Sequence, residues 1–146
     1  MKTGGIAELI KIDALDTFSV LLAVACHDLR HDGFTNNYHG RTKSDRFRRF
    51  GEAGCQEQFH FAESYALLEK NNLLEHFNKQ EHTRFKRRMQ GCIMATDLGR
   101  LHKDLDEMHT LLEENSRESI AANKKPSFET QQQILECVAH TSDVSF

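Results

Sequence analysis

The spacing of apolar residues along this chain predicts a protein built from helices. Apolar side chains recur every three or four residues over several long stretches, which is the spacing of one face of an α-helix. No stretch reads convincingly as a strand, and the single proline, Pro126, suits a mostly helical chain. We therefore expect an all-α fold, with the main helices over residues 16–31, 56–70, 78–97, 100–114 and 127–143.

Polar residues at the ends of these stretches predict where helices begin and where the chain turns. Asn78 and Glu81 have the spacing of a capping box, Ser127 caps the last helix, and Ser44 caps a short basic helix through Phe50. Residues 32–40 and 115–126 have the composition of loops. One stripe of the helix behind the capping box should be buried, namely Phe85, Met89, Cys92, Ile93 and Thr96.

Composition and charge narrow the classes of function. The 146 residues suffice for one domain with a modest core. A net charge of −3 gives no general attraction to nucleic acid, and the basic stretches 41–49 and 84–88 are interleaved with phenylalanines that suit core positions. No apolar run is long enough to span a membrane. The four cysteines form no C-x-x-C pair, so we expect free thiols, a reducing compartment and a cytoplasmic protein.

The residues after the apolar run 20–26 carry the clearest chemical signal. His27, Asp28 and His31 follow this uninterrupted run, and a carboxylate with imidazoles at the end of a buried helix is costly unless something compensates it. Imidazole nitrogen together with carboxylate oxygen is ligand chemistry for zinc, manganese or iron. Gly33 fits the left-handed position that ends a helix. The alternative is that His27 caps the helix end and Asp28 is solvated.

A second carboxylate lies on a stripe that should face the core. Asp143 follows Leu135 and Ala139 at intervals of four residues. A lone buried aspartate has a raised pKa or disrupts packing, and a metal ion removes both problems. The alternative is that Asp143 lies at a frayed helix end and is solvated.

Two further groups of polar residues are candidates for a supporting role. Glu57, His60 and Glu63 recur at intervals of three and share one side of a helix, from which the first two could orient a metal-bound water. For Glu63 we favour a solvated helix face. Thr96 and Asp97 close the next helix beside apolar residues, where they either hold ordered water or simply end the helix.

Taken in order, these motifs resemble the catalytic domain of the class I 3′,5′-cyclic-nucleotide phosphodiesterases. Each motif is weak alone, but four of them occur in the family's order at fitting separations, from about Leu15 to Ser145. The variant over residues 32–39 is most similar to protist members. The four motifs are Ala25-Cys26-His27-Asp28-x-x-His31-x-Gly33-x-x-Asn36, Glu57-x-x-His60-x-Ala62, Ala95-Thr96-Asp97-Leu98 and Val138-Ala139-His140-Thr141-Ser142-Asp143-Val144-Ser145.

The resemblance implies an HD-type helical domain that hydrolyses cAMP, cGMP or both to 5′-nucleotides in signal transduction. It implies two divalent metal ions, zinc and magnesium or else manganese, which activate a hydroxide. The metal ligands implied by matched position are His27, Asp28 and Asp143, of which Asp28 would bridge both ions. The residues implied to hold the waters and the hydroxide, or to lie beside them, are His31, Glu57, His60, Thr96 and Asp97.

The chain also departs from the family pattern. Residues 1–26 contain no histidine, where a histidine-rich segment would supply a further metal ligand and the acid that protonates the leaving oxygen. The purine-binding helices of the family would follow Asp143. Arg30 stands where an acidic residue is frequent, and Phe59 where a histidine is common; a cation at Arg30 would weaken metal binding if it points inward. We therefore expect residues 1–146 to be a partial, poorly active catalytic domain.

Two other interpretations stay open at this point. A truncated relative would act as a non-catalytic helical module that binds partners or forms a homodimer through exposed apolar faces. Other HD-type metal phosphohydrolases, which act on other phosphate esters, share the His-Asp pair with a distant aspartate. The surroundings of Glu57 and Asp97 favour the cyclic-nucleotide branch. A metal site requires that His27, Asp28 and Asp143 converge around one point.

Overall fold

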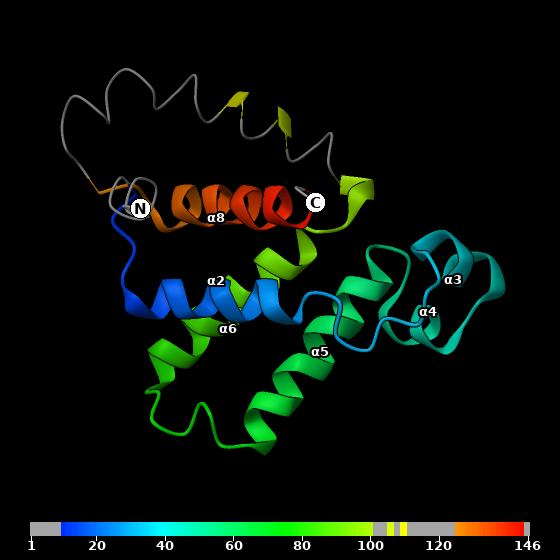
Figure 1. Ribbon diagram of the computed structural model, residues 1–146, viewed down its shortest axis with the longest axis horizontal. Helices are drawn as coiled ribbons and strands as arrows, with labels where there is room; N and C mark the ends of the chain where they lie inside the picture. Colours follow the sequence, from blue (N-terminus) through cyan, green and yellow to red (C-terminus); the bar gives the residue numbers. More distant parts are fainter. Residues whose placement is uncertain (1–9, 101–104, 107–108, 111–124, 145–146) are drawn as a thin grey trace.

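The computed structural model describes residues 10–100, 105–106, 109–110 and 125–144. Within these ranges the regular secondary structure is helical and no strand is present, which confirms the predicted all-α fold (Figure 1). No helix in the described ranges is both long enough and apolar enough to cross a membrane. The elements are α2 (Ala14–Cys26), α3 (Asn36–Thr42), α4 (Asp45–Phe50), α5 (Cys55–Lys70), α6 (Lys79–Met94), the 3₁₀ helix η1 (Leu98–Arg100) and α8 (Phe128–Asp143).

The helix starts follow the polar residues identified in the sequence. The Asn78 side chain accepts hydrogen bonds from the N–H groups of Gln80 and Glu81, and the Glu81 carboxylate accepts one from the Asn78 N–H, which completes the capping box. Ser44 and Ser127 cap α4 and α8 through their hydroxyl oxygens. These caps give partners to backbone N–H groups that a helix leaves unpaired.

The core lies where α2 and α8, side by side, pack across α6 (Figure 1). Most of the predicted stripe of α6 is confirmed, since Phe85, Met89, Cys92 and Ile93 are fully buried, whereas Thr96 lies beyond the helix end and is partly exposed. Burial raises the pKa of the Cys92 thiol to about 12, so this thiol is protonated at neutral pH. Helix α5 packs on α6, and α3 and α4 pack on α5.

A buried arginine joins the three core helices. Arg88 of α6 is fully buried, and its Nε donates to Asp16 Oδ1 of α2 at 2.9 Å. Its terminal nitrogens donate to the side-chain oxygens of Gln131 and Gln132 of α8, at 2.8 and 3.0 Å, and its guanidinium lies 3.8 Å from the centre of the Phe128 ring. Because a buried charge is costly without partners, these contacts fix how α2, α6 and α8 meet. In the sequence, Arg88 stands out only as part of the basic stretch 84–88.

Helix α2 ends earlier than predicted. The helix expected over residues 16–31 stops at Cys26, and two hydrogen-bonded turns follow it. Arg30 takes a left-handed conformation with φ of +62°, which a continuing helix does not allow. Gly33, with φ of +84°, therefore turns a loop and does not end the helix. The apolar run before Cys26 also has an exposed side, since Leu21 is 65% exposed.

Two other boundaries differ from the prediction. Helix α6 ends at Met94, short of Asp97, because the chain turns into η1. Helix α3 lies in a stretch predicted to be a loop, and it forms because the Thr35 hydroxyl oxygen accepts a hydrogen bond from the Tyr38 N–H at 3.2 Å and so caps it. The helix expected over residues 100–114 and the loop over 115–126 lie largely outside the described residues.

Removing one partner of the buried ion pair should cost much stability. Arg88→Met leaves the Asp16 carboxylate buried with Arg84 as its remaining cation, 3.3 Å away. We expect the free energy of unfolding, measured by urea denaturation, to fall by about 3 kcal/mol. The control Arg87→Met removes a solvent-exposed ion pair with Glu129 and should cost less than about 1 kcal/mol. Equal losses in the two variants would contradict a special role for Arg88.

Candidate metal and catalytic site

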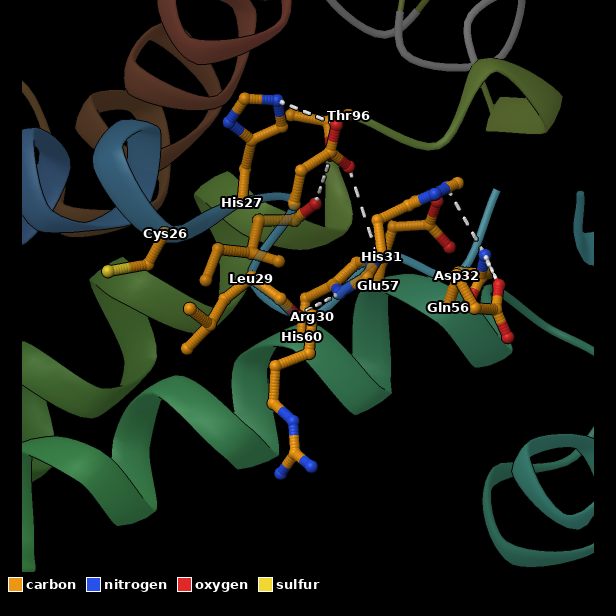
Figure 2. A network of polar contacts seen from close by, with 12 residues as sticks. Cys26, His27, Leu29, Arg30, His31, Asp32, Gln56, Glu57, His60 and Thr96 are labelled. Carbon is orange, nitrogen blue, oxygen red and sulfur yellow. Dashed lines mark hydrogen bonds and ion pairs between the residues drawn. The ribbon is translucent and has the colours of Figure 1, made fainter. Parts of the chain in front are cut away.

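The candidate site lies where the connection after α2 meets α5 and the C-terminal ends of α6 and α8. The turns after α2 carry His27, Asp28 and His31 on one short connection. Helix α5 adds Glu57 and His60 from its N-terminal half (Figure 2). The last residue of α8 completes the group. The side chains concerned are His27, Asp28, His31, Glu57, His60 and Asp143.

His27 meets both aspartates predicted to lie beside it. Its Nε2 is 2.9 Å from Asp143 Oδ1 and 3.6 Å from Asp28 Oδ2, so the predicted convergence of these residues is present. Its Nδ1 lies 2.8 Å from the Val24 carbonyl oxygen, to which it donates. In a neutral ring this bond leaves a lone pair on Nε2 against a carboxylate oxygen, and only a proton or a metal ion between them makes that contact favourable.

Asp28 is not buried, since its side chain is 65% exposed and His27 caps α2, as the alternative interpretation expected. A second set of donor atoms gathers on the other side of Asp28. One ligand atom each of Asp28, His31 and His60 lies within 4.8 Å of the others. His60 is almost fully buried, its Nδ1 is 2.8 Å from the Leu29 carbonyl oxygen, and its ring stacks on that of His31 with centroids 5.5 Å apart. Its Nε2 is buried without a hydrogen-bond partner and lies 3.9 Å from Asp28 Oδ1. A buried polar atom left in this way is unusual and points to a missing partner.

Glu57 sits in a negatively charged part of the site. Asn36 Nδ2 donates to Glu57 Oε2 at 2.9 Å and lies 3.5 Å from Asp97 Oδ1. Burial raises the pKa of the Glu57 carboxyl, and the charges of Asp97 and Asp28 raise it further, against the opposing hydrogen bond from Asn36. The negative charges of three carboxylates therefore interact here, which favours a proton or a cation among them.

The remaining candidates of the sequence analysis are placed less centrally. The Thr96 hydroxyl donates to the Ile93 carbonyl at 2.8 Å, as a residue ending a helix does. Glu63 is partly buried and forms an ion pair with Arg30, so it is neither in the site nor on a fully solvated face. Figure 2 shows the Arg30 side chain extending away from His27 and His31, so its charge does not point into the site.

Asn36 and Gln56 belong to the surroundings of the site and were not predicted to do so. No side chain of its own segment caps α5, which begins after Gly54. Asn36, which lies on α3, caps α5 instead. Its Oδ1 accepts hydrogen bonds from the Gln56 N–H at 2.9 Å and from the Cys55 thiol at 3.3 Å. It thereby fixes the first turn of α5, which carries Glu57. The only sequence signal for Asn36 was its place in the first motif.

Comparison with known families shows to which family the chain belongs. The family model described as 3′5′-cyclic nucleotide phosphodiesterase matches residues 1–146, which is the whole chain. The chain belongs to this family. The resemblance drawn from the four motifs is thereby confirmed.

The phosphodiesterase relatives are longer than this chain. A mouse dual specificity calcium/calmodulin-dependent 3′,5′-cyclic nucleotide phosphodiesterase 1C is 28% identical over 134 residues, which cover 90% of this chain and 17% of that protein. A probable 3′,5′-cyclic-AMP phosphodiesterase of Caenorhabditis elegans is 24% identical over 136 residues, covering 90% of this chain and 20% of that protein. The chain thus spans about a fifth of the length of these phosphodiesterases.

A solved structure shows the same fold. The phosphodiesterase domain of the RhoPDE fusion protein from the choanoflagellate Salpingoeca rosetta matches with a TM-score of 0.81 at 23% sequence identity. The match covers 91% of this chain and 41% of that one. The helices described above therefore correspond to part of a phosphodiesterase domain.

The burial of Glu57 predicts a pH-dependent effect on stability. Because folding raises its pKa above the unfolded value, ionisation of Glu57 penalises the folded protein as the pH rises through that range, and the penalty is absent at lower pH. Glu57→Gln should therefore stabilise the protein in EDTA at pH 7 and leave its stability unchanged near pH 3.5, about one unit below the pKa of a free glutamate. Urea denaturation at both pH values measures this.

Glu69→Gln is the matched control for this prediction, since Glu69 is an exposed carboxylate later on α5. It should change stability little at either pH. A gain from Glu57→Gln that is the same at both pH values would contradict a cause in the ionisation of Glu57.

Proposed function

We propose that this chain forms part of a catalytic domain that hydrolyses 3′,5′-cyclic nucleotides to 5′-nucleotides in signal transduction. Family membership supports this reaction, and the relatives named above include a cyclic-AMP enzyme and a dual-specificity enzyme. The observation that carries the proposal is the position of Asp28, whose two oxygens face two imidazoles, 3.6 Å from His27 Nε2 and 3.9 Å from His60 Nε2. A carboxylate placed between two sets of donors suits a ligand shared by two metal ions.

The donor set fits divalent metal ions. The buried Nε2 of His60 lacks a hydrogen-bond partner, and the Nε2 of His27 lies against a carboxylate oxygen of Asp143; a nearby cation relieves both situations. Imidazole and carboxylate together match zinc, whereas carboxylate and water match magnesium or manganese. In this proposal His27, Asp28 and Asp143 would hold zinc, and Asp28 would also serve as a ligand of the second ion.

The other residues of the site would orient the reactants. When bound, the two ions supply positive charge that lowers the pKa of a water molecule and offsets the charge of the phosphate. Asn36 holds the Glu57 carboxyl through Oε2, and in this position the carboxyl could accept a hydrogen bond from the attacking water. His60, whose Nδ1 donates to the Leu29 carbonyl, would accept a hydrogen bond from a water molecule through Nε2, and the His31 ring stacked on it would border that water. Thr96, whose proton is donated to a carbonyl, would contribute oxygen lone pairs.

We propose that full activity needs the rest of the domain. This chain spans 41% of the solved phosphodiesterase domain it matches. The family's acid for the leaving oxygen and its purine-binding residues have no counterpart among the matched motifs. Because general acid catalysis contributes about 10²–10⁴-fold, this chain alone should turn over substrate far more slowly than the domain.

We also propose that the protein works in the cytoplasm. Its cysteines are unpaired in the structure, namely Cys26, Cys55, Cys92 and Cys137. Unpaired thiols are typical of a reducing compartment, where cyclic nucleotides would be the small-molecule substrates.

Zinc binding tests the assignment of the ligands. Isothermal titration calorimetry of the metal-free chain should detect zinc binding, and Asp28→Asn should weaken the affinity by at least about 100-fold. The control Asp45→Asn alters a fully exposed carboxylate on α4 and should leave the affinity unchanged. Equal affinities for wild type and Asp28→Asn would contradict the assignment.

Hydrolysis assays test the reaction itself. This chain and a version extended at both ends to a full phosphodiesterase domain would be assayed with cAMP, cGMP and an unrelated phosphodiester, in the presence of zinc and magnesium. We expect the extended form to hydrolyse a cyclic nucleotide and to lose at least about 100-fold of its rate in Asp143→Asn, because a metal ligand is lost. A folded extended form without activity would favour a non-catalytic module. One that cleaves only the other ester would favour a different HD-type hydrolase.

A further inference from the structure

The planar guanidinium of Arg46, on α4, binds the connection between α2 and α3. Nη2 of Arg46 donates to the Arg30 carbonyl at 2.9 Å and lies 3.4 Å from Asp32 Oδ2, while Nη1 donates to the side-chain oxygen of Gln56. The guanidinium lies 3.9 Å from the centre of the Phe59 ring. The Arg46 side chain is only 15% exposed. One rigid group therefore links α4, α5 and the connection through charge-assisted hydrogen bonds and ring stacking.

Two partners of Arg46, namely Gln56 and Asp32, lie next to His31 in space or in the chain. Gln56 Nε2 lies 3.2 Å from His31 Nε2, donates to the Phe34 carbonyl at 2.6 Å and lies 3.4 Å from Asp32 Oδ1 (Figure 2). Asp32 in turn accepts from the Phe34 N–H at 3.3 Å and lies 3.4 Å from Nε2 of the buried His39. The residues on both sides of His31 are thus anchored to α3, α4 and α5.

The backbone before His31 makes this anchoring necessary. Arg30 is left-handed, with φ of +62°, and a residue other than glycine keeps such a conformation only where its surroundings fix it. The carbonyl oxygen of this same residue accepts the hydrogen bond from Arg46. The His31 ring itself is exposed and stacks on that of His60. Its Nδ1 accepts a hydrogen bond from the Gly33 N–H at 2.9 Å, so the direction of the ring depends on the conformation of the connection.

We propose that Arg46 is a positioning residue of the site, which keeps the His31 ring stacked on that of His60 and close to Asp28. The inference rests on the proposed function and deepens it, since it names the residue that shapes one side of the metal site. A lysine at this position carries the charge but lacks the planar fork that reaches a carbonyl, a carboxylate and an amide together.

The test compares Arg46→Met with Arg48→Met, whose arginine lies on the same helix, is mostly exposed and pairs with Asp45. Zinc affinity is measured by calorimetry, and the His31 ring nitrogens of the metal-free protein are observed by long-range ¹H–¹⁵N NMR. Arg46→Met should lower the zinc affinity about 10–100-fold and shift the His31 ring signals, while those of His82 on α6 stay unchanged. Arg48→Met should do neither. Unchanged affinity and unchanged His31 signals in Arg46→Met would overturn the proposal.

A second variant keeps the proposal testable if Arg46→Met does not fold. Asp32→Asn keeps the shape of the side chain but removes the charge that faces Arg46 and His39, so it should shift the His31 signals and weaken zinc binding. Wild-type values for both measurements in a folded Asp32→Asn would overturn the proposal. If the wild type binds no zinc, the proposed metal site fails, and the His31 signals alone decide: a shift in either variant supports positioning by Arg46, and no shift overturns it.

Discussion

The candidate site depends on the buried arginine that aligns α2 with α8. Arg88 binds Asp16 near the start of α2 and Gln132 near the start of α8. These two residues are therefore held at the same height along the two helix axes. His27 and Asp143 follow them by the same number of residues along two helices that run in the same direction (Figure 1). Because each residue advances a helix by a fixed rise, the two side chains arrive at the same level and meet.

The same alignment makes the meeting point electronegative. His27 caps the C-terminal end of α2, Asp143 is the last residue of α8, and Asp97 follows the end of α6. The C-terminal end of a helix carries a partial negative charge, and carboxylates gathered there add to it. Asp28 and the half-buried Glu57 increase this charge further. A divalent cation would offset it, which is the physical reason for placing the proposed metal ions here.

Local chemistry explains what the sequence could predict. The capping box at Asn78 and the buried stripe of α6 depend on residues close together in the chain, and both are present in the structure. The sequence did not show that the helix fails to reach His31, because the carbonyl of the left-handed Arg30 accepts its hydrogen bond from Arg46 on another helix. The role of Arg88 was missed for the same reason, since its partners lie on two distant segments.

The convergence of the His-Asp pair with Asp143 was predicted from the resemblance to a family and is present in the structure, whereas the ligand roles are proposals. The most direct test is crystallographic. Crystals grown with zinc should show an anomalous difference peak at the zinc absorption edge, bounded by His27 Nε2 and by carboxylate oxygens of Asp28 and Asp143. Well-ordered crystals that show no such peak, with both carboxylates directed into bulk solvent, would contradict the account.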